Sequence, residues 1–273
     1  MSTFERSPLG IVNRRLFFGT DFLVYCEGPV DTKFPTSDAL FWSVVFRAAL
    51  PGKTIKVVSS GGRGDVLNLR KTAAADKNVF FAIDSDIDLV WIRQDDPGLV
   101  RSGGYSFECD LMDEALFVDL IHDLPLGGER SNVTAAFQSG WKSKRSSIRR
   151  VGMLNAARWQ RQKKSFGKEE TMTFFDFTNR SLNRRNFLES ANSIPKQPGC
   201  SPWKISDEGL ELCCPGAPAL KFMYHILKNA VEARGLLKLF SYGTFLERLI
   251  VHYEKSATKR FFGYYESQIL SHS

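Results

Sequence analysis

The sequence contains no uninterrupted apolar run of about 18 residues, the length that a membrane-spanning helix requires. Its first residues also lack an apolar core followed by small residues at a cleavage site, so we expect no secretory signal. Cysteine is sparse, with 5 in 273 residues, and the cysteines form neither a Cys-x-x-Cys pair nor a Cys/His spacing typical of zinc. We therefore expect a cytoplasmic protein with reduced thiols and no membrane partner.

Histidine is also scarce, and the familiar nucleotide-binding motifs are missing. The 4 histidines are isolated in the sequence, so their spacing supports neither a Ser-His-Asp nor a Cys-His catalytic group. Neither the P-loop pattern nor the glycine fingerprint of dinucleotide-binding proteins occurs. A glycine cluster does follow one predicted strand, and Gly61, Gly62 and Arg63 within it are candidates for phosphate contact. A simple connecting turn is the favoured alternative.

The first third of the chain instead alternates apolar strands with amphipathic helices. Apolar segments typical of strands occur at residues 22–26, 54–58 and 80–83. Helical patterns lie between them, within residues 31–50 and from about residue 65 to 75. This β-α-β-α-β order predicts an α/β fold, a parallel sheet with right-handed crossovers and helices on its faces.

Acidic residues follow two of these strands directly. Glu27 and Gly28 come after the first strand, and Asp84, Asp86 and Asp88 come after the third. In open α/β sheets the carboxyl ends of the strands form the ligand-binding edge, so we expect these side chains to converge there. Carboxylates this close together repel one another, and Mg²⁺ is the usual compensating cation, with Mn²⁺ as the alternative. A polar loop after a strand is the other interpretation of the Asp triplet.

The remainder of the chain has weaker patterns. Short strands are predicted at residues 89–92 and 105–107, and a helix at 108–122 in which Glu108 is either a charge favoured by the helix dipole or a fourth carboxylate of the site. A polar, turn-rich segment at 126–140 and a loop at 194–218 are predicted, with amphipathic helices at 219–233 and 242–267. We place the domain boundary at residue 125, so that residues 126–273 form a basic, mainly helical domain.

Positive charge is concentrated between residues 141 and 185. This segment has 13 Lys and Arg against 3 acidic residues, a balance of +10, whereas the rest of the chain sums to −3. Aromatic residues are interleaved with the cations, a combination that suits nucleic acid because charge binds phosphates and rings stack on bases. The alternative is a solvated helical face whose aromatics are core. The candidate nucleic-acid contacts are Lys142, Lys144, Arg145, Arg149, Arg150, Arg158, Arg161, Lys163 and Lys164.

Two of these segments resemble the Toprim domain. The similarity lies in Val24-Tyr25-Cys26-Glu27-Gly28 for the first strand and its glutamate, and in Phe81-Ala82-Ile83-Asp84-Ser85-Asp86 for the Asp-x-Asp strand. Within that superfamily the chain is most similar to the DUF4435-type proteins, relatives of the OLD-family nucleases, and among them to the AriB effectors of PARIS anti-phage systems. The similarity covers roughly residues 20 to 125. Pro35 and the late position of Trp42 depart from the family pattern.

The resemblance implies a metal-dependent endonuclease with a Rossmann-like Toprim domain at residues 1–125. It implies that Glu27 is the general acid/base or a metal ligand and that Asp84 and Asp86 hold Mg²⁺. Asp88, Asp31 and Glu108 are then second-tier candidates, and Gly28 belongs to the same turn. It further implies a toxic effector of anti-phage defence that cleaves RNA, with tRNA as the leading candidate, under control of an AriA-like ABC-type ATPase. A homodimer is the expected oligomer, and an OLD-like DNA-nicking enzyme or an idle scaffold for the ATPase are the alternatives.

Overall fold

The computed structural model describes residues 8–30, 34–73, 76–87, 96–162, 164–194, 207–235, 238–256 and 261–272. The chain forms two compact units. The first contains residues 1–84, 93–103 and 253–273, and the second contains residues 85–92 and 104–252. This division differs from the boundary predicted at residue 125, because the chain leaves the first unit after Asp84 and its C-terminal segment returns to it.

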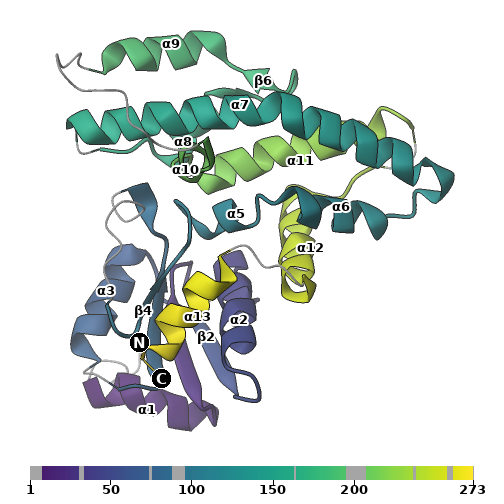
Figure 1. Cartoon of the computed structure of the whole chain (residues 1–273). Helices are drawn as coiled ribbons and strands as arrows, with labels where there is room; N and C mark the ends of the chain where they lie inside the picture. Colours follow the sequence, from purple (N-terminus) through teal and green to yellow (C-terminus); the bar gives the residue numbers. More distant parts are fainter. Residues whose placement is uncertain are drawn as a thin grey trace. The chain divides into compact units, whose positions relative to one another are not determined.

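The first unit is built on a parallel sheet of four strands in the order β2-β1-β3-β4 (Figure 1). The strands are β1 (Phe22–Cys26), β2 (Ile55–Ser59), β3 (Val79–Ile83) and β4 (Leu99–Arg101). All residues of β1 and β3 are buried, as expected for central strands covered on both faces. The predicted α/β fold with a parallel sheet is therefore confirmed. The sequence did not indicate the three-residue β4.

The described residues of this unit include the helices α1 (Pro8–Phe18), α2 (Ser37–Ala49), α3 (Arg63–Thr72) and α13 (Phe262–Leu270). The connections β1-α2-β2 and β2-α3-β3 run in opposite directions along the sheet. Since such crossovers are right-handed, α2 and α3 cover opposite faces. The predicted apolar face of α2 is confirmed, because Trp42, Val45 and Phe46 are all buried. The N-cap residue Thr36, directly after Pro35, accepts a hydrogen bond from the backbone N–H of Ala39 at 3.2 Å.

The second unit is mainly helical, as predicted for the later part of the chain, and its longest helix organises it. Its elements are α5 (Phe107–Asp110), α6 (Glu114–His122), η2 (Gly127–Glu129), α7 (Arg130–Gln162), α8 (Lys168–Met172), β5 (Phe175–Asp176), β6 (Ser181–Leu182), α9 (Arg184–Ser193), α10 (Asp207–Leu212), α11 (Gly216–Glu232) and most of α12 (Tyr242–Lys255). Figure 1 shows α11 and α10 beside α7. Phe117 of α6 stacks on Phe137 of α7, with ring centroids 5.0 Å apart.

The prediction of a turn-rich segment at residues 126–140 is wrong, because α7 begins at Arg130 and continues for 33 residues. Its first part is rich in Ser, Asn and Gly, which conceals the helical pattern. A helical signal was present in the sequence, because Val133, Phe137 and Trp141 are spaced four residues apart. All three side chains are buried. Tyr105–Phe107 is not a strand either, since Phe107 is the first residue of α5. The predicted strand at 89–92 lies outside the described residues.

Three further predictions are corrected in their bounds. The helix predicted at 108–122 is divided into α5 and α6, because Asp113 caps a new helix by accepting the N–H of Ala115 at 3.0 Å. The helix predicted at 242–267 is divided into α12 and α13, and Phe261, the N-cap of α13, has a left-handed φ of 61° that no helix interior adopts. The loop predicted at 194–218 contains α10 and the start of α11.

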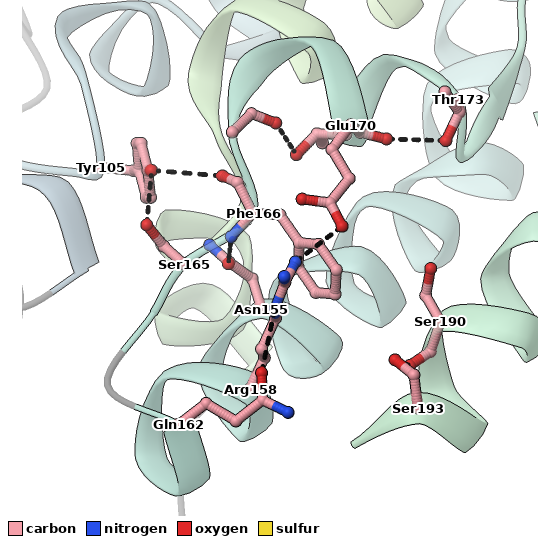
Figure 2. A network of polar contacts seen from close by, with 12 residues as sticks. Tyr105, Asn155, Arg158, Gln162, Ser165, Phe166, Glu170, Thr173, Ser190 and Ser193 are labelled. Atoms are coloured by element: carbon pink, nitrogen blue, oxygen red, sulfur yellow. Dashed lines mark hydrogen bonds and ion pairs between the residues drawn. The ribbon is translucent and has the colours of Figure 1, made fainter.

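A buried asparagine joins three segments of the second unit (Figure 2). The side chain of Asn155 is fully buried on α7; its Oδ1 accepts the backbone N–H of Phe166 at 2.7 Å, and its Nδ2 donates to the carbonyl oxygen of Cys213 at 2.8 Å. Tyr105 contributes a second connection, because its hydroxyl donates to Ser165 Oγ at 3.3 Å and to the Phe166 carbonyl at 3.4 Å. Asn155 therefore fixes the turn after α7 and the segment after α10.

Replacing Asn155 by leucine should destabilise the second unit by about 2 kcal/mol, because it leaves the Phe166 N–H and the Cys213 carbonyl buried without a partner. Asn132→Leu on the same helix is the matched control, since Asn132 is exposed and its Nδ2 donates to the Glu129 carboxylate at 3.0 Å. We expect the control to stay within ~0.5 kcal/mol of wild type. Urea denaturation followed by circular dichroism measures both, and equal stability of the two variants would contradict the role assigned to Asn155.

The described part of the chain includes no helix that is both long and apolar enough to cross a membrane. Four of the cysteines lie in described segments, and all four are buried free thiols: Cys26, Cys109, Cys213 and Cys214. This agrees with the prediction of reduced cysteines for that part of the chain.

Candidate active site at the carboxyl edge of the sheet

Glu27 and Asp84 meet at the carboxyl ends of two neighbouring strands. Glu27 follows the last residue of β1 and Asp84 follows the last residue of β3, and β1 and β3 are paired in parallel register. The backbone N–H of Asp84 donates to Glu27 Oε1 at 2.9 Å. From β1 the chain continues to β2 on one side, and from β3 it continues to β4 on the other. The two acids thus lie where the strand connections diverge, which is where open α/β sheets bind ligands.

Glycine at position 28 is required by the close approach of two turns. Gly28 has a φ of 132° and pairs with Gly61, each N–H donating to the carbonyl oxygen of the other at 2.9 Å. A Cβ at Gly28 would lie 3.0 Å from both Ser59 Oγ and Thr36 Oγ1. Those two hydroxyls are themselves 2.9 Å apart, so β1, β2 and the start of α2 are linked beside Glu27. Gly28 therefore permits a tight turn in which two backbone segments approach closely.

The glycine cluster binds a carboxylate of the chain itself. The Gly62 N–H donates to Asp65 Oδ2 at 2.9 Å, and the Gly61 N–H is used by Gly28. An ideal Cβ on Gly61 would come within 2.4 Å of the same Asp65 oxygen. Two backbone donors that a phosphate would need are therefore occupied, and the connecting-turn interpretation fits Gly61 and Gly62 better. Arg63 is half-buried as the first residue of α3, and its contact with phosphate stays a prediction.

The negative charge at the carboxyl edge of the sheet affects the pKa of Cys26, the last residue of β1. The pKa of Cys26 is raised to about 12, chiefly by burial and then by the carboxylate of Asp38, with smaller contributions from Glu27 and Asp84, whereas a hydrogen bond with Ser59 lowers it. Negative charge therefore converges on the end of β1 from three elements. Asp38 was not identified from the sequence, because an acid in the first turn of a helix has an ordinary explanation in the helix dipole. The short loop from Glu27 to α2 was the only available hint of its position.

Asp86 and Glu108 belong to the second unit, because the chain enters it at Ser85. Asp86 has a left-handed φ of 47°, and its N–H donates to the Tyr105 carbonyl at 2.8 Å. Glu108 lies in the first turn of α5 and accepts a hydrogen bond from Ser106 Oγ. Burial raises the pKa of Glu108, although that hydrogen bond and the charge of Lys168 lower it. Glu108 is thus a shielded carboxyl, and Asp31 and Asp88 lie outside the described residues.

A metal site made entirely of protein side chains is not found in the described segments, where no three His, Cys, Asp or Glu residues are grouped to hold an ion. Mg²⁺ does not require such a cage, since it usually takes one or two carboxylates and completes its shell with water and substrate phosphates. Glu27 and Asp84 match that requirement in number and in chemistry. The Asp84 N–H also holds Oε1 of the Glu27 carboxylate, at 2.9 Å.

Three arginines of the basic segment are engaged in ion pairs that join elements of the second unit. Arg145 and Arg149 both donate through Nε to Glu211 Oε1, at 2.5 and 2.7 Å, and Glu211 is buried. Arg158 pairs with Glu170 at 2.7 Å, and its guanidinium lies 4.2 Å from the centre of the Phe166 ring (Figure 2). These three side chains hold α7 to α10 and α8, which the sequence prediction of nucleic-acid contacts did not anticipate. Of the other candidates, Lys142, Arg150 and Lys164 are exposed, Lys144 and Arg161 are half-buried, and Lys163 lies outside the described residues.

The aromatics of the same segment are core residues. Trp141, Phe166, Phe174 and Phe175 are each at most 5% exposed, so they are not stacking platforms for bases. Phe175 instead packs on Phe222 of α11, with ring centroids 4.8 Å apart. The alternative interpretation, in which the aromatics form core beneath a solvated basic face, is the correct one for these four residues.

The candidate site therefore consists of two half-buried carboxylates, Glu27 and Asp84, joined by a backbone hydrogen bond at the point where the sheet connections diverge. Asp38 contributes nearby charge, and the Gly28–Gly61 bridge holds the adjoining turns together. Comparison of the chain with protein-family models and with curated proteins gives no match.

Proposed function

We propose that the chain is a metal-dependent endonuclease of the Toprim type. The observation that carries the proposal is the hydrogen bond from the Asp84 N–H to Glu27 Oε1, which joins acids from the ends of β1 and β3. A glutamate after the first strand and an aspartate after a neighbouring parallel strand are the positions that the Toprim resemblance assigns to catalysis. The segment at residues 141–185, which lies within the second unit and has 13 Lys and Arg against 3 acidic residues, supports a polyanionic substrate.

The chemistry follows from phosphodiester hydrolysis. A bound Mg²⁺ would neutralise the scissile phosphate, lower the pKa of a water molecule and stabilise the leaving oxygen. Asp84 and Glu27 would hold the ion, with Mn²⁺ as a substitute. Glu27 would also accept the proton of the attacking water, because the Asp84 N–H fixes the orientation of its carboxylate.

The substrate that we propose is RNA, with tRNA first, in the setting of a toxic anti-phage effector restrained or activated by an AriA-like ABC-type ATPase. An OLD-like DNA-nicking activity would use the same two carboxylates on a different polyanion. The scaffold alternative has one observation in its favour, because no group of three metal-binding side chains occurs in the described segments. In that case the protein would bind its ATPase without catalysis.

Incubation of the purified chain with total tRNA or with supercoiled plasmid, each in Mg²⁺, in Mn²⁺ and in EDTA, tests the proposal. The same arms are run with the ATPase present, because activity can depend on it. We expect tRNA fragments that disappear in EDTA. Metal-dependent nicking of plasmid with intact tRNA would select the DNA alternative. Intact nucleic acid in every arm, together with no Mg²⁺ binding at millimolar concentration, would select the scaffold.

A further inference from the structure

Three cations from separate elements surround a small hollow on the second unit. The hollow has a volume of about 120 Å³ and lies between α7, the β5–β6 turn and the end of α11. Lys144, Arg180 and Arg234 line it together with the amide of Asn229. Among the described residues that line it there is no Asp or Glu. We call this hollow the cationic pocket.

Local structure places each of these side chains. Gly140 allows α7 to approach α11, because a Cβ there would lie 2.6 Å from Ile226 Cγ2. Arg180 has a left-handed φ of 50°, an uncommon conformation for a residue with a side chain, and it ends the turn between β5 and β6. Arg234 Nη1 donates to the Ala230 carbonyl at 2.7 Å, which fixes the guanidinium beside the last turn of α11 and leaves its other N–H groups for a ligand.

Cations close to the cationic pocket form ion pairs with acidic side chains, whereas two of the cations that line the pocket do not. Arg145, next to Lys144 in sequence, is neutralised by Glu211, and Lys228 pairs with Glu232 at 2.6 Å. Lys144 and Arg180, by contrast, form no ion pair with any residue in the described part of the chain. The positive field extends to His225, whose pKa is lowered by burial and then by Lys221, Lys228 and Arg180.

We propose that the cationic pocket binds one phosphodiester group of a nucleic-acid strand. A hollow of about 120 Å³ has room for a tetrahedral phosphate group. Two guanidinium groups and an ammonium group supply charge-assisted donors from different directions, as phosphate recognition requires. The inference that the bound phosphate belongs to a nucleic acid rests on the proposed function. The inference that the pocket binds an anion does not.

The test is binding of fluorescein-labelled oligouridine and oligothymidine strands, followed by fluorescence anisotropy in EDTA so that no cleavage contributes. The pocket variant combines Lys144→Gln, Arg180→Asn and Arg234→Gln, with asparagine chosen because it tolerates a left-handed φ. The comparison variant combines Lys168→Gln, Arg184→Gln and Lys238→Gln, which also removes three positive charges, from exposed positions of the second unit outside the pocket. Lys144→Gln alone is the second pocket variant, because Lys144 has no ion pair in the described segments to lose. Circular dichroism establishes that all variants are folded.

We expect the pocket variant to lose about tenfold or more in affinity near 0.1 M KCl, and its salt dependence to fall by ~0.7 in log K against log salt for the lost single-strand phosphate contact. The comparison variant should lose about threefold or less, because its charges act only through screened long-range attraction. Equal losses in the two variants would overturn the pocket as a site. Binding of inorganic phosphate or a nucleoside monophosphate that depends on Lys144, with no oligonucleotide binding, would overturn the nucleic-acid assignment. Neither result depends on catalysis at Glu27, so a failure here is distinct from a failure of the proposed nuclease activity.

Discussion

Glu27→Gln is expected to reduce metal-dependent cleavage by about 10²- to 10⁴-fold while leaving the fold intact. Glutamine keeps an oxygen at the position of Oε1, so it can still accept the Asp84 N–H that wild-type Glu27 accepts at 2.9 Å. The substitution therefore removes the negative charge and the proton-accepting group and little else. Because the side chain is half-buried at a strand end and not in the core, stability should change by less than ~1 kcal/mol.

Asp65→Asn provides the matched control for this result. Asp65 lies in the same unit, and its carboxylate also accepts one backbone N–H, from Gly62, at 2.9 Å. Asparagine preserves that hydrogen bond and removes one charge, as glutamine does at position 27. Single-turnover cleavage of labelled RNA, together with thermal melts, compares the two variants, and we expect Asp65→Asn to retain cleavage within about threefold of wild type. Wild-type cleavage by Glu27→Gln would exclude Glu27 from the chemistry.

The sheet could be predicted from the sequence because its determinants are local. The apolar runs that became β1 and β3, and the face of α2 around Trp42, follow directly from residue patterns. The meeting of Glu27 and Asp84 was also predictable, since parallel strands bring their carboxyl ends to one edge. Asp38 was not, because only the packed position of α2 brings its charge near Cys26.

The basic segment shows why the rest could not be predicted. Arg145 and Arg149 look like solvent-exposed cations, yet their partner Glu211 lies 66 and 62 residues further along the chain. Nothing in the local sequence distinguishes an arginine that binds phosphate from one that binds a buried glutamate. In the same way, the grouping of Lys144, Arg180 and Arg234 depends on three elements whose packing is decided by contacts such as Gly140 with Ile226. The composition shows where positive charge is concentrated in the sequence, but it does not show which cations form ion pairs and which are available to bind a ligand.

Gly152→Ala is expected to be the most damaging single substitution in the second unit. Gly152 is buried on α7 where α10 crosses it, and an ideal Cβ would lie 1.8 Å from the carbonyl oxygen of Leu210 and 3.2 Å from the backbone nitrogen of Cys214. Backbone cannot rotate away as a side chain can, so α7 and α10 must separate. That movement would stretch the Asn155 hydrogen bond to Cys213 and the ion pairs of Arg145 and Arg149 with Glu211.

The cost of this separation should be about 3 kcal/mol or more, which exceeds the ~1 kcal/mol that alanine gains over glycine within a helix. Gly243→Ala in α12 is the control, because the nearest atom to its Cβ is Ser241 Oγ at 3.9 Å and nothing obstructs the new methyl group. We expect Gly243→Ala to match or exceed wild-type stability and Gly152→Ala to melt roughly 10 °C lower. Since α10 also carries Glu211, the Gly152 variant should also weaken the ion pairs of Arg145 and Arg149. An unchanged melting temperature for Gly152→Ala would mean that α10 does not pack on α7 in solution. The ion pairs of Arg145 and Arg149 with Glu211 would then be contradicted as well.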